Sequence, residues 1–76
     1  MTNIPRTPVI SSNLRSVGYD ADARLLEIEF ASGALYRYRD VPQRVYSLLM
    51  GAARVGKAFQ LHIVGQYAFE TVTKPS

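Results

Sequence analysis

The clearest candidate for binding chemistry is a glycine-flanked segment that carries two basic residues. Gly51 and Gly56 bracket Arg54, and Lys57 follows directly. Backbone N–H groups at the start of a helix, together with basic side chains, can hold a phosphate group. The segment is not a Walker-type phosphate loop, because Ala58 stands where that motif needs serine or threonine. We therefore predict an anion site that contains Arg54 and Lys57.

Two further residues extend this predicted site. Arg44 precedes the segment on the predicted helical side, and His62 follows it among apolar residues. A lone histidine in such surroundings is typically half-buried and hydrogen-bonded, which is the alternative for His62. The predicted nucleic-acid or anion-binding set is thus Arg44, Arg54, Lys57 and His62.

Two tyrosines, Tyr36 and Tyr38, offer a different kind of surface. Aromatic residues at positions i and i+2 of an exposed sheet can stack on successive bases of a single-stranded nucleic acid. The alternative is that both rings pack in the core, with only their hydroxyl groups at its rim. The strand register derived below places both rings against buried residues, so we expect core packing.

The sequence lacks the residue patterns that are typical of catalysis or metal binding. Cysteine is absent, which excludes disulfides, thiolate metal sites and a cysteine nucleophile. One histidine and six scattered acidic residues do not suffice for the common multi-ligand metal centres. No Ser–His–Asp or paired-carboxylate spacing is present. We expect a non-enzymatic protein without catalytic residues, metal site or cofactor.

The charge balance is compatible with an anionic partner but does not require one. Nine basic residues oppose six acidic residues, which gives a net charge of +3 at pH 7. Seven of the nine are arginines, which bind phosphate through two nitrogens and stack on bases. Genome base composition can produce the same preference for arginine, and a net charge of +3 is ordinary for a small domain.

The length of 76 residues allows one domain only. Residues 1–9 contain two prolines and no periodicity, so we expect an extended or mobile leader there. The domain is predicted to span residues 10–72, and residues 73–76 to form a polar tail. Because no run of about 18 apolar residues and no apolar signal region occurs, we expect a cytoplasmic protein that does not associate with membranes.

Residues 14–39 predict three antiparallel strands. Apolar and polar residues alternate over 14–20, 25–30 and 34–39, and turn-forming residues separate these runs. In the second hairpin, a two-residue turn needs a positive φ at Ser32, whereas a three-residue loop needs it only at Gly33. The three-residue loop gives the pairs Phe30–Ala34, Ile28–Tyr36, Leu26–Tyr38 and, on the opposite face, Glu27–Arg37. Because turn chemistry and opposite charge both favour it, we predict this register, with the Glu27 face in solvent.

The apolar period becomes that of a helix after Asp40, which is the predicted cap or dipole partner of that helix. The apolar stripe consists of Val41, Val45, Leu48, Leu49 and Ala52, with Pro42 in the first turn. A second, short helix is predicted to start near Gly56 and to stop at Gly65. Residues 67–73 are rich in β-forming residues and leave open a fourth, edge strand. The predicted fold class is α+β: an antiparallel three-stranded meander with one face covered by one main helix and a second short helix.

The order of these segments resembles the KTSC domain, a small module named from the C-terminal part of some lysyl-tRNA synthetases and also found as a stand-alone bacterial protein. The matching elements are Ser11-Ser12, Gly18-Tyr19-Asp20, Leu26-Glu27-Ile28-Glu29-Phe30, Gly33, Tyr36-Arg37-Tyr38, Val41-Pro42, Ala52, Gly56-Lys57-Ala58-Phe59 and His62-Ile63-Val64-Gly65-Gln66-Tyr67. The resemblance covers roughly residues 9–70.

The resemblance implies RNA binding, through the attachment of the module to a tRNA-handling enzyme, and supplies no catalytic residue. The chain departs from the family pattern at Arg54, where serine is common, and at Val64, where a basic residue is common. We expect a small binding module for RNA or another polyanion. The alternative is a protein-interaction or homo-oligomerising module that acts through its sheet edges.

Overall fold

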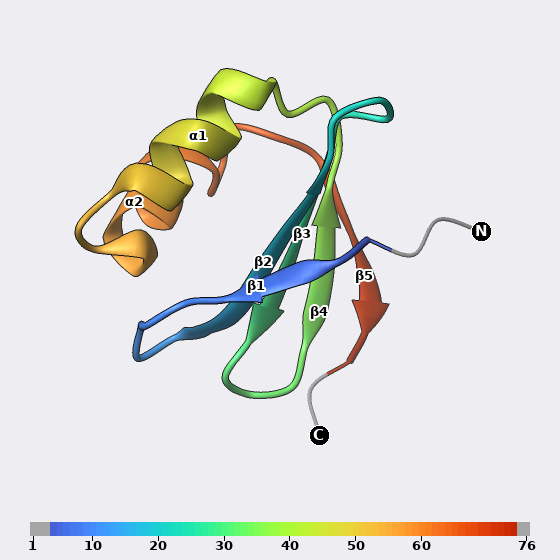
Figure 1. Cartoon of the computed structure of the whole chain (residues 1–76). Helices are drawn as coiled ribbons and strands as arrows, with labels where there is room; N and C mark the ends of the chain where they lie inside the picture. The colour runs from blue at the N-terminus through green and yellow to red at the C-terminus, as the bar shows by residue number, and fades with distance from the viewer. Residues whose placement is uncertain (1–3, 75–76) are drawn as a thin grey trace.

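The computed structural model describes residues 4–74, which form an antiparallel sheet with two helices against one of its faces (Figure 1). The elements in chain order are β1 (Arg6–Pro8), β2 (Leu14–Asp20), β3 (Leu25–Phe30), β4 (Leu35–Tyr38), α1 (Gln43–Gly51), α2 (Val55–His62) and β5 (Phe69–Thr73). Each strand pairs antiparallel with its neighbour in the chain, so the order in the sheet is β1-β2-β3-β4-β5. The predicted α+β class with an antiparallel sheet and two helices is confirmed.

The sheet has five strands rather than the three or four that the sequence predicts. The possible fourth strand within residues 67–73 is present as β5. Thr73 therefore belongs to the sheet and not to the expected polar tail. The unexpected strand is β1, within the segment expected to be a leader, where Ile4 is also buried. A three-residue strand that ends at Pro8 is too short to show an alternating pattern. Residues 1–3 and 75–76, the ends of the expected leader and tail, lie outside the described residues.

The second hairpin has the register that the sequence predicts. Its strand pairs are Ile28–Tyr36, Leu26–Tyr38 and Glu27–Arg37. Gly33 has a φ of 94°, in the left-handed region, and its N–H donates to the Phe30 carbonyl oxygen at 2.9 Å. The Phe30 N–H donates in turn to the Ala34 carbonyl oxygen at 2.9 Å, which closes the three-residue loop. This loop therefore decides which side chains of β4 face the helices.

Substituting Gly33 with valine should destabilise the protein by about 1–2 kcal/mol or more, because a β-branched residue at positive φ is strained. Chemical denaturation of both proteins measures the difference. Gly33→Asn is the matched control, since asparagine tolerates this region better than other residues with a side chain. Equal stabilities for Gly33→Val and Gly33→Asn would contradict the proposed strain.

The hydrophobic core lies between the helices and the sheet face that carries the rings of β4. Its largest fully buried side chains are Leu14, Leu26, Ile28, Leu49, Ile63, Val17 and Val41. Each such side chain contributes about 1.5–3 kcal/mol when it is removed from water. The whole core cluster also includes Tyr38 of β4 and Phe59 of α2, so both helices and the three central strands β2, β3 and β4 contribute to it. Burial of this cluster therefore holds the sheet and the helices together.

The helix starts differ slightly from the predicted ones. The N-cap of α1 is Pro42, without a side-chain hydrogen bond, so Asp40 is not the cap. Asp40 instead has a φ of 59°, and aspartate is among the residues that tolerate this region at a sharp change of direction. α2 begins at Val55, one residue before the predicted start at Gly56.

The sheet face opposite the helices is expected in solvent, but its centre is buried. Glu27 is 2% exposed. Arg37 Nη2 donates to one of its carboxylate oxygens at 2.7 Å, and Arg6 Nη1 donates to the other at 2.8 Å. The predicted Glu27–Arg37 pair is present, but the prediction that this face is solvated is wrong at Glu27, because β1 brings Arg6 to the same carboxylate.

Candidate functional site

The positive charge of the chain is concentrated in its helical segment, residues 41–69. That segment contains Arg44, Arg54 and Lys57 and no acidic residue, whereas the rest of the chain holds six basic and six acidic residues. The entire net charge of +3 therefore belongs to the part that contains α1 and α2. All three side chains are solvent-exposed. An anion near these helices is attracted by charges that no acidic residue of the segment offsets.

Arg54 and Lys57 line one open cavity of about 460 Å³ at the N-terminal end of α2. The other lining residues are Ile10, Ser11, Ser12, Asn13, Ala53, Val55, Gly56 and Gln60, none of them acidic. The first turn of α2 has neither a side-chain cap nor an acidic residue. The N–H groups of a first helical turn have no intrahelical partner, and here they add partial positive charge beside the two basic side chains.

Gly56 allows the two walls of this cavity to approach closely. A Cβ atom at position 56 would lie 2.8 Å from Ser11 Oγ. That hydroxyl oxygen accepts hydrogen bonds from the N–H groups of Asn13 and Leu14, both at 3.3 Å. Because a side chain at position 56 would displace Ser11, the glycine keeps the loop before β2 against the start of α2.

The structure separates the other two predicted site residues from this cavity. Arg44 lies on α1 and lines a different cavity, with Ser47, Leu48 and Gly51. His62 is the last residue of α2, about 12 Å along the helix axis from Arg54 at a rise of about 1.5 Å per residue. It is exposed, so its expected half-burial is wrong. The neighbours Phe59 and Ile63 occupy the buried face of this turn instead.

Tyr36 and Tyr38 lie on the helix-facing side of β4. Tyr38 is 4% exposed, and its burial, with a smaller effect from Tyr36, raises the pKa of the Tyr38 hydroxyl above its ordinary value of 10.0. Tyr36 is half-buried, and its ring stacks on that of Phe69 in β5 with 4.8 Å between the ring centroids. The two tyrosines therefore do not form an exposed platform for successive bases.

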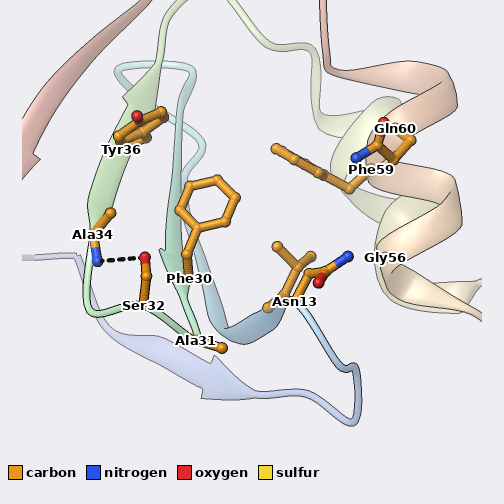
Figure 2. Close-up of a pocket in the computed structure, with 10 residues that line it drawn as sticks. Asn13, Phe30, Ala31, Ser32, Ala34, Tyr36, Gly56, Phe59 and Gln60 are labelled. Atoms are coloured by element: carbon orange, nitrogen blue, oxygen red, sulfur yellow. Dashed lines mark hydrogen bonds between the residues drawn. The ribbon is translucent and has the colours of Figure 1, made fainter. Parts of the chain in front are cut away.

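A second cavity, of about 430 Å³, is formed between the second hairpin and α2 (Figure 2). It is lined by Asn13, Leu14, Phe30, Ala31, Ser32, Ala34, Tyr36, Gly56, Phe59 and Gln60. Three of these residues, Asn13, Gly56 and Gln60, also line the basic cavity, so the two cavities adjoin. Sequence reasoning missed this site, because its walls come from three separate stretches that no single pattern connects.

The described part of the chain has neither a cluster of metal-binding side chains nor a membrane-spanning helix. Among residues 4–74, no three histidine or acidic side chains gather closely enough to hold a metal ion. Neither of the two helices has the length and hydrophobicity that crossing a bilayer would need.

Comparisons with known proteins give a consistent result. The family model of the KTSC domain matches residues 10–67. A protein of Stutzerimonas stutzeri is 50% identical over 54 residues, which cover 71% of this chain and 76% of that protein. A protein of Tsukamurella paurometabola is 38% identical over 50 residues, which cover 66% of this chain and 75% of that protein. The crystal structure of a KTSC domain protein from Yersinia pestis superimposes with a TM-score of 0.89 at 37% identity, covering 93% of this chain and all of that one.

Proposed function

The chain belongs to the KTSC domain family, and on that premise we propose that it is a non-enzymatic module that binds single-stranded RNA or a similar polyanion at the cavity beside Arg54 and Lys57. The observation that carries the proposal is the segregation of charge: the helical segment holds the whole net charge, and two of its three basic side chains line one cavity. Paired basic side chains that flank a helix start suit successive phosphate groups of a flexible strand.

The departures from the family pattern support the same cavity. By the pattern that the family resemblance implies, Arg54 adds a positive charge in place of serine, and Val64 removes one in place of a basic residue. The structure places Arg54 as the N-cap of α2, beside the cavity, and Val64 beyond the C-terminal end of that helix. Relative to that family pattern, this chain has one more positive charge at the start of α2 and one fewer beyond its C-terminal end.

The affinity for RNA should be modest and should depend on salt. Each phosphate contact to a single strand contributes a slope of about −0.7 to the plot of log affinity against log salt. Contacts from Arg54 and Lys57 alone predict a slope of about −1.4, and an additional contact from Arg44 about −2. So few contacts cannot hold a strand tightly without stacking partners.

We expect Arg54→Ala/Lys57→Ala to abolish most of the binding of a fluorescently labelled single-stranded RNA at low salt, and to flatten the salt dependence of what remains. Fluorescence anisotropy at low and moderate salt measures both quantities. The matched control is Arg39→Ala/Lys74→Ala, which removes the same two charge types from exposed positions near the sheet. Equal losses in the two double variants, or wild-type binding that ignores salt, would place the interaction elsewhere.

A second candidate function is protein interaction through the sheet edge. All five residues of β5 are exposed, and this strand is one edge of the sheet, with Phe69 49% and Val72 44% exposed (Figure 1). An edge strand of this kind can pair with a strand of a partner or of a second copy. If the wild-type protein binds no RNA even at low salt, this function becomes the preferred one, and sedimentation over a range of concentrations would test self-association.

A further inference from the structure

The cavity between the second hairpin and α2 has aromatic walls. Phe30 lies between Tyr36 and Phe59, with ring centroids 5.0 Å and 5.7 Å away, both in edge-to-face arrangements (Figure 2). Phe30 and Tyr36 are half-buried and Phe59 is buried, so the rings are fixed by packing against the core. A cavity of about 430 Å³ falls within the range of about 300–1,000 Å³ that small-molecule sites occupy.

Two side-chain amides lie at the rim of these aromatic walls. Asn13 and Gln60 are both solvent-exposed and line the cavity from the loop before β2 and from α2. Among the residues drawn in Figure 2, the hydrogen bond marked joins the Ala34 N–H to Ser32 Oγ, so neither amide is bonded to another lining residue. Each amide offers two donors and one acceptor. A purely hydrocarbon ligand would leave these groups unused, whereas the edges of a nucleobase match them.

The aromatic cavity opens beside the charges. Asn13, Gly56 and Gln60 line both it and the cavity that contains Arg54 and Lys57. A ligand that occupies the aromatic cavity with a flat ring can therefore place an attached anion against the basic side chains. A nucleotide has both parts, a flat base and an attached phosphate group.

We propose that the aromatic cavity receives the base of one nucleotide, whose phosphate group lies at Arg54 and Lys57. This inference rests on the proposed function and extends it: the protein holds an RNA strand by one inserted base as well as by its phosphates. Stacking on fixed aromatic rings supplies affinity, and the amides of Asn13 and Gln60 hydrogen-bond the base edge.

Titration of the ¹⁵N-labelled protein with adenosine monophosphate and with ribose 5-phosphate tests the inference, because the two ligands share the phosphate and differ by the base. Adenosine monophosphate should bind at least about tenfold more tightly, as expected for one stacked base. It should also shift the amide signals of Ala34, Tyr36 and Phe59, which line the aromatic cavity but not the basic one and which ribose 5-phosphate should leave in place.

The double variant Asn13→Ala/Gln60→Ala should lose most of the affinity for adenosine monophosphate. Its affinity for ribose 5-phosphate should fall by a smaller factor, because both amides also line the cavity that contains Arg54 and Lys57. Gln43→Ala/Gln66→Ala, which removes two exposed amides outside the described cavities, is the matched control and should behave as the wild type. The spectra themselves report whether each variant is folded.

Equal affinity for the two ligands, or no binding of adenosine monophosphate at millimolar concentration, would overturn the inference. Salt-dependent RNA binding through Arg54 and Lys57 could then still hold, so the proposed function would stand without the base site. Conversely, tight binding of the mononucleotide without any binding of single-stranded RNA would support the base cavity and refute the proposed function.

Discussion

Replacing Tyr38 with alanine is expected to lower the free energy of unfolding by about 3–5 kcal/mol, the usual range for truncating a buried aromatic side chain. Tyr38 packs against Phe59 of α2, with 5.7 Å between ring centroids, and against Phe69 of β5 at 5.2 Å. The substitution therefore removes contacts that join β4 both to the helices and to the edge strand. Because native proteins are stable by only about 5–15 kcal/mol, the variant should unfold at much lower urea concentration when followed by circular dichroism.

The matched control is Tyr38→Phe, which keeps the ring and its contacts. Volume-conserving replacements of this kind usually cost less than about 1.5 kcal/mol. A Tyr38→Ala protein as stable as the parent would contradict the burial of this ring. It would also reopen the interpretation of β4 as a surface for stacking bases.

The position of Tyr38 could be predicted because local chemistry determines it. Gly33 accepts a positive φ without strain, which selects the three-residue loop, and that loop places Tyr38 opposite Leu26. The helices could be predicted for a similar reason, since the apolar period changes from two to 3.6 after Asp40. The sequence was less informative for β5, because all five of its residues are exposed and no buried face marks the strand.

Other features depend on contacts between distant segments and leave no local pattern. β1 has three residues, all exposed, so its place in the sheet depends on its hydrogen bonds to β2 rather than on a hydrophobic face. The burial of Glu27 could not be foreseen for the same reason, because Arg6 of β1 covers one of its oxygens. Of the predicted anion-binding residues, Arg54 and Lys57 were placed together since they lie three positions apart at one helix start.

The aromatic cavity, too, could not be predicted from the sequence, because it is formed by distant segments. Its walls combine the hairpin loop, the residue before β2 and one face of α2, so no window of the sequence contains it. Gly56 is the residue that the close approach of these segments requires, because a Cβ atom there would lie 2.8 Å from Ser11 Oγ. The glycine alone does not reveal the approach, since Gly51, also in a short helix, has open space around it. That approach brings the amide of Asn13 to the rim of the cavity.

Replacing Glu27 with alanine should be nearly as damaging as the loss of Tyr38. Its side chain is 3% exposed and bonds Arg6 at 2.8 Å and Arg37 at 2.7 Å. Removing one member of a buried ion pair costs about 3–5 kcal/mol, since the remaining charge loses its partner. The arginine side chains are 31% and 19% exposed and can turn partly toward water, so we expect the lower end of that range, about 3 kcal/mol. Urea denaturation measures the loss.

The control for Glu27 lies two residues away in the same strand. Glu29 faces the same side of the sheet and is 25% exposed. It pairs with Arg15 at 3.7 Å and accepts a hydrogen bond from Ser16 Oγ at 2.8 Å, so Glu29→Ala should cost about 1–2 kcal/mol, less than Glu27→Ala. Because Arg6 belongs to β1, Glu27→Ala should also speed hydrogen exchange at the amides that join β1 to β2, while those between β3 and β4 stay protected. Equal losses of stability from the two glutamate variants, with no change of exchange in β1, would show that the carboxylate of Glu27 does not anchor the N-terminal strand.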